Sequence, residues 1–234
     1  MTPGQPGPRP RYDEVLTVAG IRIPFDPKVI TPLTEAPMRA GTYELAEARE
    51  LRRILRAGDR VLELGGGVGF LSTIAALSPG IGRVVTVEAS PKLIPMIRET
   101  HRLNGVTGVE VIAGAAVAEG GGDIDFFLRP HFWGSSLDAN LRAYSRAVKR
   151  PRIAVAPLIA GLRPSVIVCD IEGGEDGLFD GADLSPVRHM VIELHPKAYG
   201  EEGVDRVLAV LNAKGLRGDP TAPKRKGVVL LDRV

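Results

Sequence analysis

Acidic side chains gather at the ends of two apolar runs in the second half of the chain. The runs cover 166–170 and 189–194, and the residues at and after their ends are Asp170, Glu172, Glu175, Glu193 and His195. A carboxylate that is buried without a partner costs several kcal/mol, so these side chains must reach a cleft. In a cleft they could accept a proton from a weakly acidic group, or hold a hard divalent cation.

A glycine-rich turn follows an apolar run much earlier in the chain. After 60–64, the turn contains Gly65, Gly66, Gly67 and Gly69. Main chain without side chains lets a ligand approach closely, and a turn that opens a helix suits a nucleotide-like ligand. In the dinucleotide fingerprint the third glycine would fall at position 70, where Phe70 stands, so the pattern disfavours NAD.

The next apolar run, 83–88, ends in an acid. Glu88 lies 23 positions after Gly65 (88 minus 65). A carboxylate at this place can accept hydrogen bonds from both hydroxyls of a ribose, and it would repel a 2′-phosphate. The turn and Glu88 together therefore predict a nucleoside-containing ligand.

The elements that must position these residues alternate between strand and helix. Strands are expected at 60–64, 83–88, 109–112, 123–128, 166–170, 189–194 and 227–232, and helices at 43–56, 70–77, 91–103, 138–149 and 204–214. Parallel strands need crossover helices, so this order predicts a doubly wound α/β fold whose sheet is covered on both faces. Alternating apolar residues around Gly20 predict a small β-hairpin before it.

Composition limits the class of protein. The chain has 234 residues, 44% hydrophobic residues, 25% charged residues and a formal net charge of +2, which fit one globular domain and do not favour a nucleic-acid partner. The single Cys169 excludes a disulfide framework, and no run is long enough to span a membrane. We expect a flexible Pro/Gly-rich tail at 1–12, a hairpin and loop extension at 13–42, a domain at 43–234, and a cytoplasmic location.

The turn resembles the first motif of class I S-adenosylmethionine-dependent methyltransferases, E/D-x-G-x-G-x-G. The matching residues are Glu63, Gly65, Gly67 and Gly69. The resemblance implies a mostly parallel, seven-stranded Rossmann-like sheet and S-adenosylmethionine as cofactor, with Glu88 on the ribose and Ala89 beside the adenine. An acid at position 63 fits a sulfonium ligand, because it would repel a phosphate.

Further motifs resemble the FkbM-type methyltransferases. Their D-x-E-G-x-E pattern occurs at 170–175, G-x-Y-E at 41–44, and a small polar loop at 134–137, whereas the three glycines at 65–67 replace the G-A-N of many members. The resemblance adds Tyr43, Ala115 and Asp170 to the implied cofactor contacts. It also implies methyl transfer to a hydroxyl of a sugar or a polyketide-like metabolite.

An aliphatic hydroxyl needs help to lose its proton during methyl transfer. The candidate bases are His195, Asp170, Glu172 and Glu193, with Mg²⁺ as an alternative means of activation. Glu175 could instead be an acid in the first turn of a helix, and the aromatic residues at 131–133 could form a substrate lid or seal the core. An RNA methyltransferase, a nicotinamide-dependent oxidoreductase, an inactive cofactor-binding protein and a homodimer all stay open.

Overall fold

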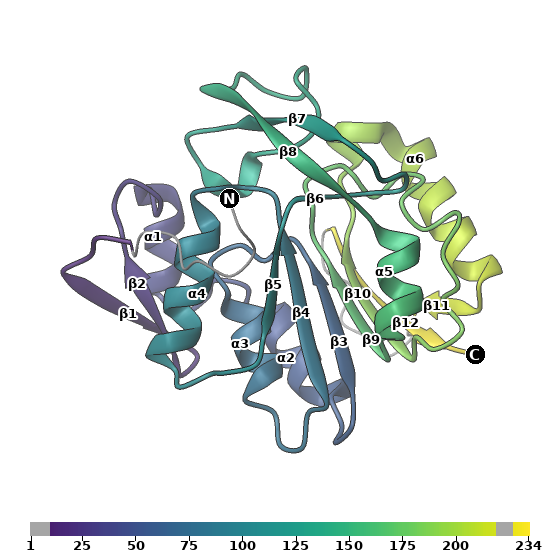
Figure 1. Cartoon of the computed structure of the whole chain (residues 1–234), viewed down its shortest axis with the longest axis horizontal. Helices are drawn as coiled ribbons and strands as arrows, with labels where there is room; N and C mark the ends of the chain where they lie inside the picture. Colours follow the sequence, from purple (N-terminus) through teal and green to yellow (C-terminus); the bar gives the residue numbers. More distant parts are fainter. Residues whose placement is uncertain (1–9, 219–226) are drawn as a thin grey trace.

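The computed structural model describes residues 10–218 and 227–234. Its centre is a seven-stranded sheet (Figure 1). In order across the sheet the strands are β11 (Leu216–Gly218), β12 (Val228–Arg233), β10 (His189–Glu193), β9 (Val166–Cys169), β3 (Arg60–Leu64), β4 (Arg83–Glu88) and β5 (Glu110–Ala113). Residues 1–9, which belong to the predicted flexible tail at 1–12, lie outside the described residues.

Strand direction confirms the predicted architecture. The five strands from β10 to β5 are mutually parallel, whereas β12 is antiparallel to both of its neighbours. This is the mostly parallel, Rossmann-like arrangement that the sequence predicted. The central strands are buried along nearly their whole length, as expected for strands covered on both faces.

Helices cover the two faces of the sheet. One face packs against α2 (Leu45–Ile54), α3 (Phe70–Ala76) and α4 (Leu93–Leu103), and the other packs against α5 (Val155–Leu162) and α6 (Pro196–Ala213). Neighbouring strand residues alternate between the two cores, so Val61 joins the first and Leu62 the second. Both cores are therefore built by the same strands.

The N-terminal hairpin is also confirmed. Strands β1 (Glu14–Val18) and β2 (Ile21–Phe25) pair antiparallel around Ala19 and Gly20. Both turn residues have positive φ, 47° and 87°, which is typical of a two-residue hairpin turn. Buried hairpin residues join the core on the α4 face, and a helix that the sequence did not predict, α1 (Pro32–Arg39), follows the hairpin.

A second, three-stranded sheet lies beyond the upper edge of the main sheet in Figure 1. It consists of β6 (Ala115–Val117), β7 (Asp123–Leu128) and β8 (Arg146–Ala154), with the short helix η1 (Phe132–Gly134) between β7 and β8. The predicted helix at 138–149 is wrong: residues 138–145 form no helix, and the last four residues begin β8, which pairs with β7 from Leu128↔Arg146 to Asp123↔Pro151. Pairing with a distant strand overrides local helix propensity here.

Among the described residues, no helix is both long enough and apolar enough to cross a membrane.

The glycine turn provides a test of this packing. Gly67 and Gly69 both have positive φ, but a Cβ on Gly69 would lie 2.9 Å from the Cα of Ile97 in α4, whereas a Cβ on Gly67 would meet only the Tyr43 hydroxyl, at 3.6 Å. We expect Gly67→Ala to lower the free energy of unfolding by about 1–2 kcal/mol, the cost of a left-handed alanine, and Gly69→Ala to lower it by more.

Denaturant unfolding measures both changes. Gly105→Ala is the matched control for backbone strain, since Gly105 has φ +67° and nothing within 4 Å of its Cβ position. Equal destabilisation by Gly69→Ala and Gly105→Ala would contradict close packing of the turn on α4.

Candidate active site

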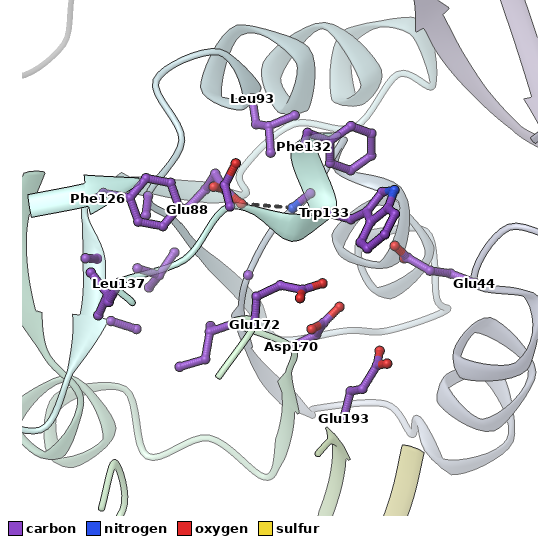
Figure 2. Close-up of a pocket in the computed structure, with 18 of the residues that line it drawn as sticks. Glu44, Glu88, Leu93, Phe126, Phe132, Trp133, Leu137, Asp170, Glu172 and Glu193 are labelled. Carbon is purple, nitrogen blue, oxygen red and sulfur yellow. Dashed lines mark hydrogen bonds between the residues drawn. The ribbon is translucent and has the colours of Figure 1, made fainter. Parts of the chain in front are cut away.

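A cavity of about 330 Å³ opens at the carboxyl ends of β3, β4, β9 and β10 (Figure 2). Ligands of open parallel sheets bind at this edge. The lining residues come from the strand ends, the α1–α2 segment and the second sheet, and comprise Leu33, Thr34, Pro37, Tyr43, Glu44, Gly65, Gly67, Val87, Glu88, Ala89, Leu93, Gly114, Ala115, Ala116, Phe126, Phe132, Trp133, Ser135, Leu137, Asp170, Ile171, Glu172 and Glu193. The structure thus brings both predicted constellations to one cavity.

Gly65 and Gly67 reach the cavity for different reasons. At Gly65 a Cβ would lie 1.7 Å from the carbonyl oxygen of Asp170, so only glycine lets the turn and the end of β9 approach this closely. At Gly67 the space beside the backbone is open, and its N–H donates to Glu88 Oε2 at 3.0 Å. The turn therefore presents bare main chain next to a carboxylate.

Glu88 is buried, with 6% of its surface exposed. Its carboxylate also accepts a hydrogen bond from the Ser90 N–H at 2.6 Å. Burial raises the pKa of Glu88 to about 7, although the backbone N–H donors favour the ionised form. The predicted contacts Ala89 and Ala115 line the cavity beside it, with Leu93 and Phe126 adding apolar wall, which makes a pocket suited to a flat ring.

Two residues of the glycine motif do not line the cavity. Glu63 is 2% exposed and lies beneath the turn, where burial raises its pKa to about 7. Gly69 immediately precedes α3 and packs against Ile97. The structure therefore places both behind the turn, where they support it, while Tyr43 does line the cavity and packs its ring edge on Phe70 at 5.8 Å between centroids.

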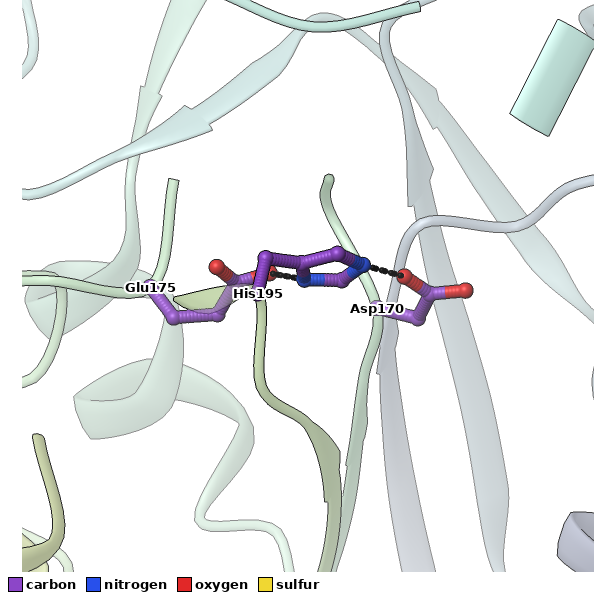
Figure 3. Close-up of side chains that lie close together, drawn as sticks. All are labelled: Asp170, Glu175 and His195. Carbon is purple, nitrogen blue, oxygen red and sulfur yellow. Dashed lines mark hydrogen bonds and ion pairs between the residues drawn. The ribbon is translucent and has the colours of Figure 1, made fainter. Parts of the chain in front are cut away.

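The predicted acidic residues meet around one histidine. Asp170, Glu172 and Glu193 line the cavity, and His195 lies just behind them. His195 Nε2 is 3.6 Å from Asp170 Oδ1, 3.7 Å from Glu172 Oε2 and 4.0 Å from Glu193 Oε1. On the other side of the ring, Nδ1 is 3.1 Å from Glu175 Oε1 (Figure 3).

These neighbouring carboxylates determine the charge state of the His195 ring. Burial by itself lowers the pKa of His195, but its hydrogen bond to Glu175 and the charges of Glu175, Asp170 and Glu172 raise that pKa to about 9. In this arrangement the imidazole is cationic near neutral pH and has no free lone pair to accept a proton. The geometry consequently favours a carboxylate over His195 as the proton acceptor.

The carboxylates differ in how well they suit that role. Burial raises the pKa of Glu172 to about 7, with His195 acting in the opposite direction. Burial and the neighbouring Glu193 and Glu172 hold the pKa of Asp170 well above its usual range. A base is most effective with a pKa near the working pH, so Glu172 is the best candidate among them.

The expectation that Glu175 is a first-turn helix acid is wrong. The described chain between β9 and β10 forms turns rather than a helix. Glu175 is 1% exposed, and its Oε1 accepts hydrogen bonds from the backbone N–H groups of Ile171 and Gly173, at 3.2 and 3.4 Å. A buried carboxylate thus holds the loop that carries Asp170 and Glu172.

Sequence reasoning missed Glu44 as a cavity residue. It lies at the start of α2 in a left-handed conformation, φ 44°, and burial raises its pKa to about 8. The G-x-Y-E match marked this position but carried no role for the acid. The aromatic residues Phe132 and Trp133 line the cavity, and Phe132 also packs against the core, so the structure is consistent with both predicted roles of this loop.

A buried arginine shapes that loop. Arg129 is 6% exposed and donates to the carbonyl oxygens of Asp138 and Arg142 and to Ser136 Oγ. These bonds fold 129–142 back on itself, which places Ser135 and Leu137 on the cavity wall. The motif match at 134–137 therefore marks a loop whose shape depends on Arg129.

Comparison with known proteins finds partial matches. No protein-family model matches the chain. The protein-L-isoaspartate O-methyltransferase of Methanoculleus marisnigri is 37% identical over 83 residues, which cover 36% of this chain and 36% of that protein. The protein of the same name from Methanococcus aeolicus is 39% identical over 61 residues, which cover 26% of this chain and 28% of that protein. The matches span about a third of these relatives.

Both relatives are methyltransferases by name. Among solved structures, TYW2 of M. jannaschii in complex with AdoMet is 12% identical with a TM-score of 0.49, covering 94% of this chain and 86% of that one. A precorrin-6y C5,15-methyltransferase from Geobacter metallireducens is 14% identical with a TM-score of 0.47, covering 89% and 91%. Such identities carry no information on the substrate, and the FkbM-type assignment stays a prediction.

The raised pKa of Glu88 predicts a pH-dependent stability. A carboxyl whose pKa is about 7 when folded and 4.5 in its ordinary state binds more protons in the folded protein, so its contribution to stability is greatest at low pH and is lost as pH rises towards 7. We expect the unfolding free energy of the wild type, relative to Glu88→Gln, to fall between pH 5 and 7 by at most about 1.4 kcal/mol per pH unit.

Urea unfolding of both proteins at several pH values measures this difference. The nearby Glu63 has a similarly raised pKa, but it is present in both proteins and largely cancels. A difference that does not change with pH would mean that Glu88 is already ionised at pH 5.

Proposed function

We propose that this protein is an S-adenosylmethionine-dependent methyltransferase that methylates a hydroxyl of a small acceptor. The observation that carries the proposal is the hydrogen bond between the Gly67 N–H and the Glu88 carboxylate at the edge of an open cavity. It fixes a buried acid beside bare main chain, where a ribose can bind. The methyltransferase names of the two partial relatives support the same reading.

The residues present fit this cofactor. A Cβ at Gly67 would enter the open space in front of the turn, 3.6 Å from the Tyr43 hydroxyl, so the glycine keeps that space free. Glu88 would hold the ribose, and the apolar wall of Ala89, Leu93 and Ala115 would contact the adenine. S-adenosylmethionine carries no phosphate group. This agrees with the carboxylates that line the cavity, because they would repel a phosphate.

The charged side chains of the cavity wall limit which acceptors can bind. Among the residues that the structure describes, the lining includes five carboxylates, Glu44, Glu88, Asp170, Glu172 and Glu193, and no lysine or arginine. A carboxylate acceptor, such as the isoaspartate named for the two relatives, would be repelled by this wall. The acids instead suit a neutral polyhydroxylated acceptor, whose hydroxyls can donate hydrogen bonds to them. A sugar or polyketide-like metabolite has that chemistry.

Glu172 performs the proton transfer in this proposal. Its carboxylate would accept the proton of the acceptor hydroxyl as that oxygen takes the methyl group and the methyl–sulfur bond breaks, which leaves S-adenosylhomocysteine as the second product. The cofactor supplies an electrophilic methyl on a sulfonium. Glu175 keeps the loop of Asp170 and Glu172 in place, and the protonated His195 limits repulsion among the carboxylates.

The cofactor assignment is tested by calorimetry with S-adenosylhomocysteine. We expect Glu88→Ala to weaken binding by about 1–3 kcal/mol, because the ribose hydroxyls lose their buried acceptor. The exposed Glu119→Ala is the matched control and should bind like the wild type. Tighter binding of NAD than of S-adenosylhomocysteine, or an unchanged affinity in Glu88→Ala, would overturn the assignment.

The chemical role of Glu172 is tested with an acceptor found by screening polyhydroxylated compounds for S-adenosylhomocysteine formation. We expect Glu172→Gln to lower turnover by about 10²–10⁴ with little change in cofactor affinity. Glu119→Gln controls for the loss of a surface charge. Cofactor binding without turnover of any acceptor would support an inactive cofactor-binding protein instead.

A further inference from the structure

Two walls of the cavity do not belong to the main sheet. One is the α1 helix, and the other is the loop 129–142; together they contribute Leu33, Thr34, Pro37, Phe132, Trp133, Ser135 and Leu137. In Figure 2 the side chains of Phe132 and Trp133 project into the cavity on the side opposite Asp170 and Glu172. These two walls therefore cover the cavity from outside the sheet.

One hydrogen bond joins the two walls. Thr31 Oγ1 and His131 Nδ1 lie 2.7 Å apart, although these residues are 100 positions apart in the chain. Within the part of the chain that the structure describes, no other hydrogen bond and no ion pair connects 31–44 with 129–142. The Thr31–His131 bond, which we call the clasp, is thus the polar link between the walls.

The position of Thr31 shows that its hydroxyl serves this contact. Thr31 is the N-cap residue of α1, and a threonine there ordinarily accepts a hydrogen bond from the first backbone N–H groups of its own helix. The Thr31 side chain makes no such bond. Its hydroxyl reaches His131 instead, so it holds the loop rather than the helix end.

His131 extends the clasp to the cavity wall. Its ring stacks on the Trp133 ring, with 5.7 Å between centroids and 11° between planes. The Arg142 guanidinium lies 5.3 Å from the centre of the Trp133 ring, and the Arg142 carbonyl accepts a hydrogen bond from Arg129 at 3.0 Å. Trp133 is therefore attached to its own loop and, through His131, to the start of α1.

A ligand that contacts Glu88 and Ala115 lies deep in the protein. These residues are 6% and 2% exposed, although both line the cavity. Hydrogen-bonded ladders hold the strands of the sheet together, whereas α1 is a short helix with Pro37 inside it, and Gly41 beyond its end has open space around it. Separating α1 from the loop breaks one polar link, so the cavity opens at this boundary at the lowest cost in free energy.

We propose that the clasp closes α1 and the loop 129–142 over the cavity, and that it opens each time a nucleoside-containing ligand enters or leaves. The hydrogen bond is then formed in the free protein and again over the bound ligand. Its loss destabilises both closed states equally. The identity of the ligand rests on the proposed function, whereas the clasp itself does not.

The clasp can be tested without any ligand, because Trp133 is the only tryptophan in the chain. Loss of one buried hydrogen bond should raise the open fraction by about 3–10-fold. We expect acrylamide to quench Trp133 fluorescence faster in Thr31→Val and in His131→Phe than in the wild type, after correction for the fluorescence lifetime. Thr31→Ser keeps the hydroxyl and should behave like the wild type. Thr17→Val, at an exposed position of β1, is the matched control.

Stopped-flow binding of S-adenosylhomocysteine tests what the clasp does. Thr31→Val should raise the association and dissociation rate constants by about 3–10-fold each and change Kd by less than about twofold, because the open form gains population with and without the ligand. A residue that contacts the ligand would change Kd instead. The double variant Thr31→Val/His131→Phe should behave like either single variant, since both remove the same bond.

Three results would overturn the proposal. They are unchanged Trp133 quenching in Thr31→Val, unchanged rate constants despite altered quenching, and a weaker affinity with an unchanged association rate, which would make Thr31 a ligand contact. If S-adenosylhomocysteine does not bind the wild type, the proposed function fails, and the quenching experiment alone then decides whether the clasp exists.

Discussion

The close approach of Gly65 to the carbonyl oxygen of Asp170 is the contact on which the site depends. It lets β3 and β9 lie side by side up to their last residues, with the Asp170 N–H donating to the Leu64 carbonyl at 2.9 Å. A side chain at position 65 would force the two strand ends apart. The glycine turn would then no longer lie beside the acidic loop, and the cavity between them would lose two of its walls.

The same edge of the sheet concentrates negative charge. Parallel strands end together, so acids that are far apart in sequence become neighbours, and burial raises the pKa of Glu44, Glu63, Glu88 and Glu172. The single positive charge of His195 balances only part of this negative charge. The cavity therefore suits a positively charged ligand, such as the sulfonium of the proposed cofactor.

Secondary structure was predictable where periodicity and burial agree. The central strands are apolar on both faces, and their crossover helices carry one apolar face, so both signals are local. The second sheet was not predictable in the same way. The sequence predicts a helix at 138–149, but residues 146–149 pair with β7 and begin the strand β8. The proline-containing α1 gave no helical signal, because Pro37 lies within it.

By itself, the sequence determined the central strands, most of the helices that connect them, the glycine turn and the acids at three strand ends, because each follows from residue type and short-range spacing. Only the tertiary structure decided what those residues do. It placed Glu63 and Gly69 behind the turn, brought Glu44 to the cavity, and set His195 between carboxylates that raise its pKa. Charge state and access depend on neighbours distant in sequence, and no local pattern encodes them.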